Sequence, residues 1–230
     1  MSSALSAFAA VTIASGLIAG CSSSGSSGTD TLPDAGTLLQ QSSQTTKNLK
    51  SAHLDIAVEG KIDGLPLKKL SGDLTNVPAT AVQGNATITM GGSDLDAQLI
   101  VIDGNLYAAL SANSWLDMGP AADIYDPSTI LNPDTGLANM LSGFSDAKSE
   151  AGEKINDVDT VKVTGQVSAD AVNKLIPQLQ ATGPLPGTAW IEKDGDHNLV
   201  QASIQQSTGN SIQMTLSDWN KPVTVTKPQV

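Results

Sequence analysis

The alternation of apolar and polar residues with a period of two constrains this chain most. It begins in segment 53–59, where Leu54, Ile56 and Val58 fall on one side of a strand and the residues between them on the other. It recurs over residues 86–90, 95–101, 106–110, 161–163, 189–191, 200–204 and 212–216. Turns such as Gly91-Gly92-Ser93 and Asp103-Gly104 separate some of these segments, because glycine supplies the positive φ of a tight hairpin. Strands joined by such turns pair antiparallel, so the sequence predicts one large antiparallel sheet.

Three other segments predict helices. Asp34 stands at an N-cap position, which indicates a helix from about Ala35 to Ser51. Prolines that follow capping residues indicate a helical insertion over residues 120–144, across one mouth of the sheet. Ser168 opens a further helix, which Pro177 limits. The expected fold class is therefore α+β: a strongly curved antiparallel β-sheet, or half-barrel, packed on helices at its concave face.

Several positions on the expected inner face carry alanine, a poor strand former that fills little volume. These positions are Ala86, Ala97, Ala108 and Ala202. Either helices press close to the sheet there, or space is left for a ligand. An ordinary filled core and an apolar cavity both agree with the pattern.

Composition excludes some classes of partner. The chain has a formal net charge of −11 and no arginine, which disfavours binding to nucleic acid or to anionic headgroups through a basic face. Aromatic residues make up 3% of the chain, so a stacking platform for sugars would have few rings and recognition through carbohydrate alone is disfavoured. The apolar residues are mostly aliphatic, as is usual around acyl chains.

The first residues read as a targeting segment. Ile18-Ala19-Gly20-Cys21 closes an uncharged, alanine-rich stretch that is shorter and less apolar than the roughly 20 residues of a transmembrane helix. We expect residues 1–20 to be a lipoprotein signal peptide cleaved between Gly20 and Cys21, and Cys21 to be the lipid attachment point. Residues 21–31 would be a Ser/Gly linker, and 32–230 a single domain. No Lys or Arg precedes Cys21, which leaves open a start upstream of Met1 that would supply the positive segment of a leader.

The sequence carries no familiar catalytic motif. It lacks G-x-S-x-G, H-E-x-x-H, G-x-G-x-x-G and a P-loop, and His53 and His197 are more simply structural or solvated than catalytic. A lone cysteine excludes an internal disulfide and argues against a cysteine-based zinc site. We therefore expect no enzyme activity, no cofactor and no metal site.

The three tryptophans have two readings. Trp115, Trp190 and Trp219 are most simply core anchors at strand ends. Trp115 could instead form the rim of an opening together with Met118 and Tyr125, beside the proline-containing insertion.

Several segments of the sequence are distinctive. They are Leu32-Pro33-Asp34-Ala35, Leu49-Lys50-Ser51-Ala52-His53, Leu70-Ser71-Gly72-Asp73-Leu74, Gly91-Gly92-Ser93-Asp94, residues 119–127 and 131–139, and Val225-Thr226-Lys227-Pro228. Together they resemble a known family, the mycobacterial LppX/LprA/LprF/LprG lipoproteins. The resemblance extends from the lipobox to the C-terminus and is most specific over residues 119–139.

The resemblance implies a half-barrel sheet on helices around an apolar cavity, similar to periplasmic lipoprotein carriers. It also implies a carrier of triacylated lipids, namely lipoarabinomannan, phosphatidylinositol mannosides and triacylglycerol, that works beside a major-facilitator export pump. The implied location is the outer, periplasmic face of the inner membrane, with the cell wall or a secreted form as further places.

We expect the cavity to be lined by Ala86, Ile88, Met90, Leu99, Val101 and Leu106. We expect the segment from Asp123 to Leu141 to form its rim, with Trp115, Tyr125, Leu137 and Leu141 as rim residues. The alternative is a solid-cored surface lipoprotein that acts through protein–protein interaction.

Overall fold

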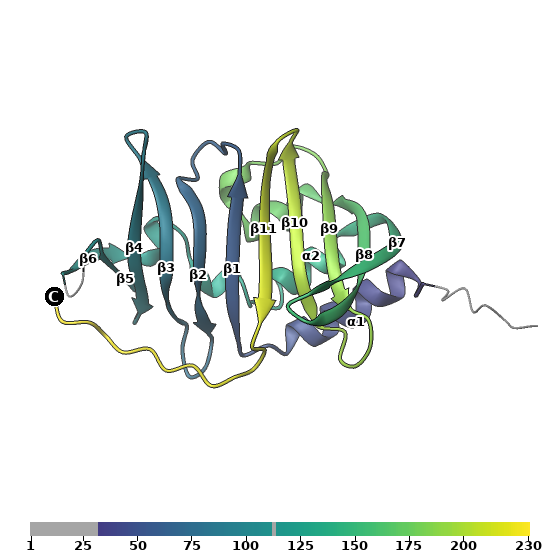
Figure 1. The fold of residues 1–230 in the computed structure, drawn as a ribbon, viewed down its shortest axis with the longest axis horizontal. Helices are drawn as coiled ribbons and strands as arrows, with labels where there is room; N and C mark the ends of the chain where they lie inside the picture. Colours follow the sequence, from purple (N-terminus) through teal and green to yellow (C-terminus); the bar gives the residue numbers. More distant parts are fainter. Residues whose placement is uncertain (1–31, 112–113) are drawn as a thin grey trace, which may run out of the picture. The chain divides into compact units, whose positions relative to one another are not determined.

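The structure, a computed structural model, describes residues 32–111 and 114–230. In this part of the chain eleven strands form one antiparallel sheet in the order β6-β5-β4-β3-β2-β1-β11-β10-β9-β8-β7 (Figure 1). The sheet does not close, so β6 and β7 are its edges. The strands are β1 (Ser51–Glu59), β2 (Leu67–Thr75), β3 (Ala81–Met90), β4 (Ser93–Ile102), β5 (Asn105–Ala109), β6 (Trp115–Pro120), β7 (Phe144–Ile155), β8 (Val158–Val167), β9 (Leu185–Glu192), β10 (Leu199–Ser207) and β11 (Asn210–Ser217). This α+β architecture is the one that the sequence predicts.

The sheet consists of two meanders that meet in its middle. Strands β1 to β6 run outward to one edge, and β7 to β11 run inward from the other. They are joined by the pairing of β1 with β11, in which His53 lies opposite Ser217 and Val58 opposite Ile212. No hairpin connects these two strands, so the local sequence pattern does not reveal their pairing.

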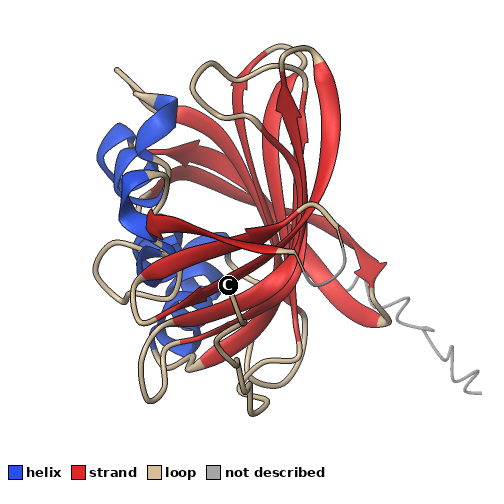
Figure 2. Cartoon of the chain, turned by 90° about the vertical axis from the view of Figure 1, so that its left-hand side faces the viewer, coloured by secondary structure: helices blue, strands red, loops and turns tan. Residues whose placement is uncertain are grey.

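The helices gather on one face of the curved sheet (Figure 2). They are α1 (Ala35–Lys47), α2 (Leu137–Ser142) and α3 (Ala169–Leu175), with 3₁₀ turns η1 (Ala121–Asp123), η2 (Pro127–Thr129) and η3 (Pro177–Leu179). Helix α1 begins where the Asp34 carboxylate accepts a hydrogen bond from the Thr37 N–H at 2.8 Å. It ends at Lys47, earlier than expected, because the chain turns at Asn48 and enters β1 at Ser51.

The main core lies between the helices and strands β1, β2 and β8–β11. Helix α1 packs on α2, β7 and β9, and the Ser43 hydroxyl donates a hydrogen bond to the Ala138 carbonyl at 2.9 Å. The largest fully buried core side chains include Leu38, Leu74, Leu137, Met140, Leu141, Ile191, Leu199 and Leu216. Every member of this cluster lies between Ala35 and Leu216, so residues 32–230 contain it entirely and form one compact folding unit.

Three strands do not follow the alternating pattern. The sequence pattern assigned no strand to the residues of β7, yet this strand pairs with β8 from Phe144 opposite Val167 to Ile155 opposite Val158. Its side chains are mostly exposed because it is an edge strand interrupted by two register shifts. Strand β6 is largely exposed as well, and in β2 the buried residues Gly72, Leu74 and Thr75 lie only toward its C-terminal end. Burial therefore imposed no regular apolar period along the whole of either strand.

The start of α3 gives a first test of how local sequence stabilises the fold. The Ser168 hydroxyl accepts a hydrogen bond from the Ala171 N–H at 3.3 Å. We expect Ser168→Ala to lower the free energy of unfolding by about 1 kcal/mol, because an N–H of the first turn loses its partner. A urea titration followed by circular dichroism measures the change, and an unchanged midpoint would show that the cap contributes nothing.

Candidate functional site

The six expected lining residues lie on one face of the sheet. Ala86 is opposite Ala97, and Val101 is opposite Leu106. The row of cross-strand neighbours that contains Leu99 runs through Gly84 and Gly72 to the core residue Leu54 in β1. Leu99 therefore lies on the same face of the sheet as Leu54. Ile88 and Met90 have the same parity as Ala86 in β3. The alternation therefore assigned the helix-side face of β3, β4 and β5 correctly, whereas their role as a cavity lining stays a prediction.

This face opens progressively from the middle of the sheet to β6. Leu54 in β1 is 3% exposed, whereas Leu116 in β6, at the end of the same cross-strand row, is 60% exposed. The residues between them are small or half-buried: Gly72, Gly84, Leu99 and Ala108. The apolar face is thus closed at the centre of the sheet and accessible to solvent at its β6 end.

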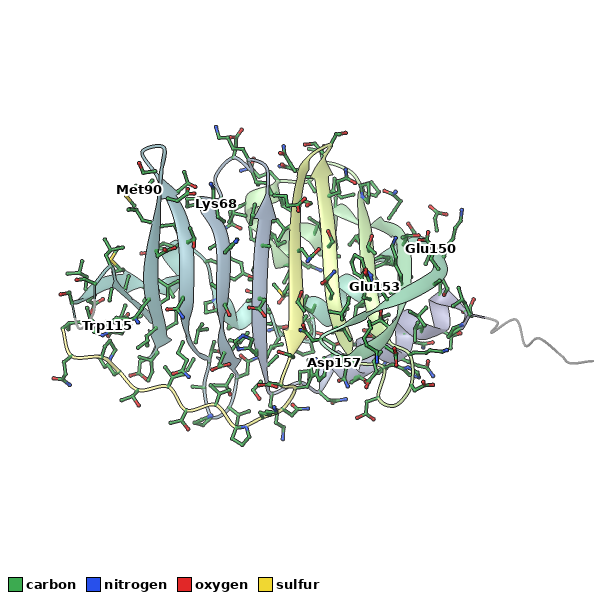
Figure 3. The ribbon with its side chains drawn as sticks, in the orientation of Figure 1. Lys68, Met90, Trp115, Glu150, Glu153 and Asp157 are labelled. Atoms are coloured by element: carbon green, nitrogen blue, oxygen red, sulfur yellow. The ribbon has the colours of Figure 1, made fainter. Side chains whose placement is uncertain are left out.

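Large exposed apolar side chains concentrate at that end. They are Met90, Leu110, Leu116, Met118 and Ile124, which we call the apolar end of the sheet; Figure 3 labels Met90 at the tip of the β3–β4 hairpin. Leu116 faces the helix side because it lies opposite Ala108. A local concentration of exposed apolar side chains is a usual sign of a binding surface.

A glycine pair brings β2 and β3 unusually close together beside this face. Gly72 and Gly84 lie directly opposite each other, and a Cβ added to either would lie 2.8 Å from the other's Cα. A Cβ on Gly72 would also meet the Gln83 carbonyl oxygen, so neither position accepts a side chain without moving a strand. The pair leaves a shallow floor between Leu54 and Leu99.

The insertion after β6 is tied to the body of the protein at both of its sides. The Ala121 N–H donates to the Gly104 carbonyl at 2.9 Å, and the Tyr125 hydroxyl donates to the Leu175 carbonyl at 2.9 Å. Burial raises the pKa of the Tyr125 hydroxyl well above its usual range, with a smaller contribution from the Asp126 carboxylate. Tyr125 therefore stays protonated and serves as a hydrogen-bonded anchor of the insertion.

The structure places the other expected rim residues differently from the sequence-based expectation. Leu137 and Leu141 are each 1% exposed in the closed core, so they would border an opening only if α2 moved. Trp115 lies opposite Ala109, which is opposite Gln98, so it occupies the face away from the helices. The residue that sequence reasoning missed is Leu116, although the alternation of residues 115–118 contained the signal. Met118, which was expected beside Trp115 at an opening, is 51% exposed.

The tryptophans also divide between the two faces. Trp219 packs against the core, and its indole N–H donates to the Leu199 carbonyl at 3.3 Å, which confirms the anchor reading for this residue. Trp190 lies opposite Gln201 and Lys162 on the outer, helix-free face. Its indole N–H donates to Glu153 Oε1 at 3.1 Å.

The outer face contains a hollow of about 560 Å³ that crosses strands β11 and β1 to β5. Its walls are two cross-strand rows of mainly polar residues, and the row between them contributes the floor. One wall contains Thr215, Asp55, Ser71, Asn85, Gln98 and Ala109; the other contains Gln213, Ala57, Lys69, Thr87, Asp96 and Ser111. Both walls belong to the face opposite Leu54 and Leu99, because their residues alternate with that apolar row along each strand.

A second hollow, of about 370 Å³, continues along the same face and shares Ser71, Asn85 and Gln98 with the first. It also contains His53, whose Nδ1 lies 2.7 Å from Asp73 Oδ1 and whose Nε2 lies 3.2 Å from Ser71 Oγ. The hydrogen bond with His53 lowers the pKa of Asp73 most, and one from Gln83 adds to it.

The order Asp73, His53, Ser71 matches that of a nucleophile triad. However, β2 is paired on both sides at Ser71. The backbone N–H groups beside the Ser71 hydroxyl are therefore engaged in the ladder and cannot form an oxyanion hole. This geometry orients the imidazole and supplies no complete catalytic centre.

Two further features bear on the site. No helix within residues 32–111 and 114–230 is long and apolar enough to cross a membrane, and the same residues contain no group of three His, Cys, Asp or Glu side chains that could hold a metal ion. The expected cleavage and acylation positions, Gly20 and Cys21, lie outside the described residues.

Sequence comparisons find relatives over nearly the whole chain. The family model described as LppX_LprAFG lipoprotein matches residues 34–225. The chain is 54% identical over 226 residues to the lipoarabinomannan carrier protein LprG of Mycobacterium tuberculosis H37Rv, covering 98% of this chain and 95% of that protein. It is 45% identical over 218 residues to the protein of the same name in Mycobacteroides abscessus, covering 95% and 94%.

Solved structures support the same relationship. LprF from Mycobacterium bovis matches with a TM-score of 0.78 and 30% identity, covering 86% of this chain and 99% of that one. LppX from Mycobacterium tuberculosis matches with a TM-score of 0.65 and 29% identity, covering 84% and 98%.

Proposed function

This chain belongs to the LppX/LprA/LprF/LprG lipoprotein family, and on that premise we propose that it is a lipid-anchored carrier of triacylated lipids. The candidate cargoes are lipoarabinomannan, named for the LprG relatives, and with it phosphatidylinositol mannosides and triacylglycerol. The carrier would take its cargo at the outer face of the inner membrane and move it toward the outer envelope, beside a major-facilitator export pump. Cys21 would hold it at the membrane, with residues 21–31 as the tether.

The observation that carries this proposal is the apolar end of the sheet. Met90, Leu116 and Met118 are more than half exposed, and exposing them to water costs free energy that an acyl chain would recover. Each CH₂ group removed from water contributes about 0.8 kcal/mol, so three chains of ordinary length would be retained strongly without a covalent bond. Methionine side chains adapt to irregular apolar ligands, which suits a carrier of several related lipids.

The small residues of the inner face indicate where the chains would lie. Ala86 and Ala97 are neighbours across β3 and β4, and helix α1 packs on β7 and β9 rather than on these strands. The alternative in which helices press on the alanines is thus not supported for α1. We propose that acyl chains extend over Ala86, Leu99, Val101 and Leu106, with Ile88 and Met90 beside them, while the polar headgroup remains in water.

Release of the cargo then requires movement of the segment that borders the face. Residues 121–136 are attached through the Ala121 N–H, the Tyr125 hydroxyl and Gln178, whose side-chain amide donates to the Ile124 carbonyl at 3.2 Å. Ile130 and Leu131 belong to the buried core cluster, so we propose that the part before Ile130 moves first. Breaking its hydrogen bonds is inexpensive compared with unfolding the core. The Asp123–Leu141 segment is therefore our candidate for the adjustable rim, with Leu137 and Leu141 becoming accessible only if α2 shifts.

Organic extraction of the purified 32–230 domain tests the carrier function. We expect stoichiometric triacylated lipid in the extract, identified by mass spectrometry, because the organic solvent would dissolve the acyl chains bound on the apolar face. A preparation that is folded but free of lipid, even after incubation with triacylglycerol vesicles, would contradict the proposal. It would favour the alternative, a solid-cored surface lipoprotein whose partner is a protein.

A further inference from the structure

The outer face holds one cross-strand row that runs between two tryptophans. It begins at Trp115, passes through Ala109 to Gln98, Asn85, Ser71 and Asp55, and continues through β11 and β10 to Trp190. Between Asp55 and Trp190 the row contains Thr215 of β11 and Gln201 of β10. Neighbouring strands lie about 4.8 Å apart, so the row extends over roughly 40 Å along the sheet. Figure 3 labels Trp115 at one end and Glu153, the hydrogen-bond partner of Trp190, toward the other.

We propose that this row is a binding site for a neutral glycan chain. The side-chain amides of Asn85 and Gln98 line both hollows and make no hydrogen bond within the described residues. An amide donates and accepts, which matches a sugar hydroxyl that also donates and accepts. The strand spacing places such a group about every 4.8 Å, comparable to the length of one sugar ring.

The charges along the hollow determine which glycans fit. In the larger hollow the one cation, Lys69, is accompanied by the two carboxylates Asp55 and Asp96, and the chain as a whole carries a net charge of −11. A sulfated or phosphorylated polymer would be repelled. Carboxylates accept hydrogen bonds from hydroxyl groups, so a neutral glycan is attracted by the same side chains.

The low aromatic content made a stacking site for sugars improbable from sequence alone, but the tryptophans supply aromatic rings for one. Three tryptophans cannot form an extended stacking platform, but two of them lie in this one row. Trp115 is half-buried and borders the smaller hollow, where one face of its indole can pack against the C–H groups of a sugar ring. The row would thus bind a chain by hydrogen bonds along its length and by stacking at Trp115.

Strand β6 connects this row to the apolar end of the sheet. Adjacent residues of this edge strand face opposite sides, with Trp115 outward and Leu116 toward the helices. A glycolipid could therefore place its acyl chains on one face and lead its sugar chain around the edge to the other. In this respect the inference extends the proposed function, although glycan binding by the row does not require lipid to be bound.

The test measures acyl-free sugars binding to the purified 32–230 domain. The probes are mannohexaose and arabinohexaose, with a heparin hexasaccharide as the charged comparison, followed by tryptophan fluorescence and calorimetry. We expect at least one neutral hexasaccharide to bind and the heparin fragment to bind at least tenfold more weakly. Gln98→Leu should weaken neutral binding at least tenfold, while Gln205→Leu, an exposed amide on the same face but outside the row, should leave it unchanged.

Two results would overturn the inference: no binding of either neutral sugar at millimolar concentration, or equal affinity of the Gln98→Leu and wild-type domains. The lipid content of the same samples, measured by native mass spectrometry, separates this failure from failure of the carrier function. A domain that holds lipid but no sugar would refute only the glycan site. A domain that holds sugar but no lipid would refute only the carrier proposal.

Discussion

Replacing Ala86 by tryptophan is expected to abolish lipid uptake by a domain that still folds. Ala86 is 2% exposed and lies between Leu70 and Ala97 on the helix-side face. An indole there would occupy the space above the neighbouring alanine, between the closed core and the apolar end of the sheet. The added bulk costs about 1–3 kcal/mol through overpacking, which leaves the separate core cluster intact because Ala86 is not a member of it.

Native mass spectrometry measures the lipid content, and thermal unfolding checks the fold. The matched control is Thr89→Trp, which adds an indole to the same strand but on the opposite face, where the Thr89 hydroxyl donates to Asp94 Oδ1 at 2.9 Å. We expect this control to keep its lipid. If the Ala86→Trp domain carried lipid at wild-type occupancy, the acyl chains would not pass over Ala86.

The period-two pattern identified the inner face because successive side chains of a strand point to opposite faces of the sheet, so burial of one face makes every second residue apolar. Val101 and Leu106 were predicted to line one surface, and they are direct cross-strand neighbours. The pattern could not supply the pairing of β1 with β11, since that pairing joins strands at the two ends of the domain. It also missed β7, where an exposed edge strand needs no apolar face.

The rim residues were harder to predict because they depend on tertiary contacts. The short helix α2 lies within the helical insertion predicted over residues 120–144, but nothing in its sequence tells whether Leu137 and Leu141 face an opening or the closed core. For Trp115 the difficulty was register: a shift of one residue moves a side chain to the other face. Only the pairing of Trp115 with Ala109 shows that Leu116 is the residue facing the apolar side.

The contrast between Leu137 and Leu116 gives the second strong prediction, since one leucine belongs to the closed core and the other to the open face. Leu137 is 1% exposed, so Leu137→Ala should lower the free energy of unfolding by about 2–5 kcal/mol through lost burial and a residual cavity. Leu116 is 60% exposed, so Leu116→Ser should change stability by no more than about 0.5 kcal/mol. The urea midpoints of the two variants measure this difference.

The two substitutions should affect lipid content in the reverse way, with the larger loss of lipid in Leu116→Ser. Leu116→Ser places a hydroxyl where we propose that an acyl chain leaves the sheet, so the fraction of lipid-loaded domain should fall although the fold is intact. Leu137→Ala should keep its lipid below its unfolding midpoint, because the side chain lies within the core and not on the open face. If Leu116→Ser retained full occupancy while Leu137→Ala lost its lipid in the folded state, the cargo would lie among the helices, and the acyl site would have to be moved from β3–β6 to the core side of α2.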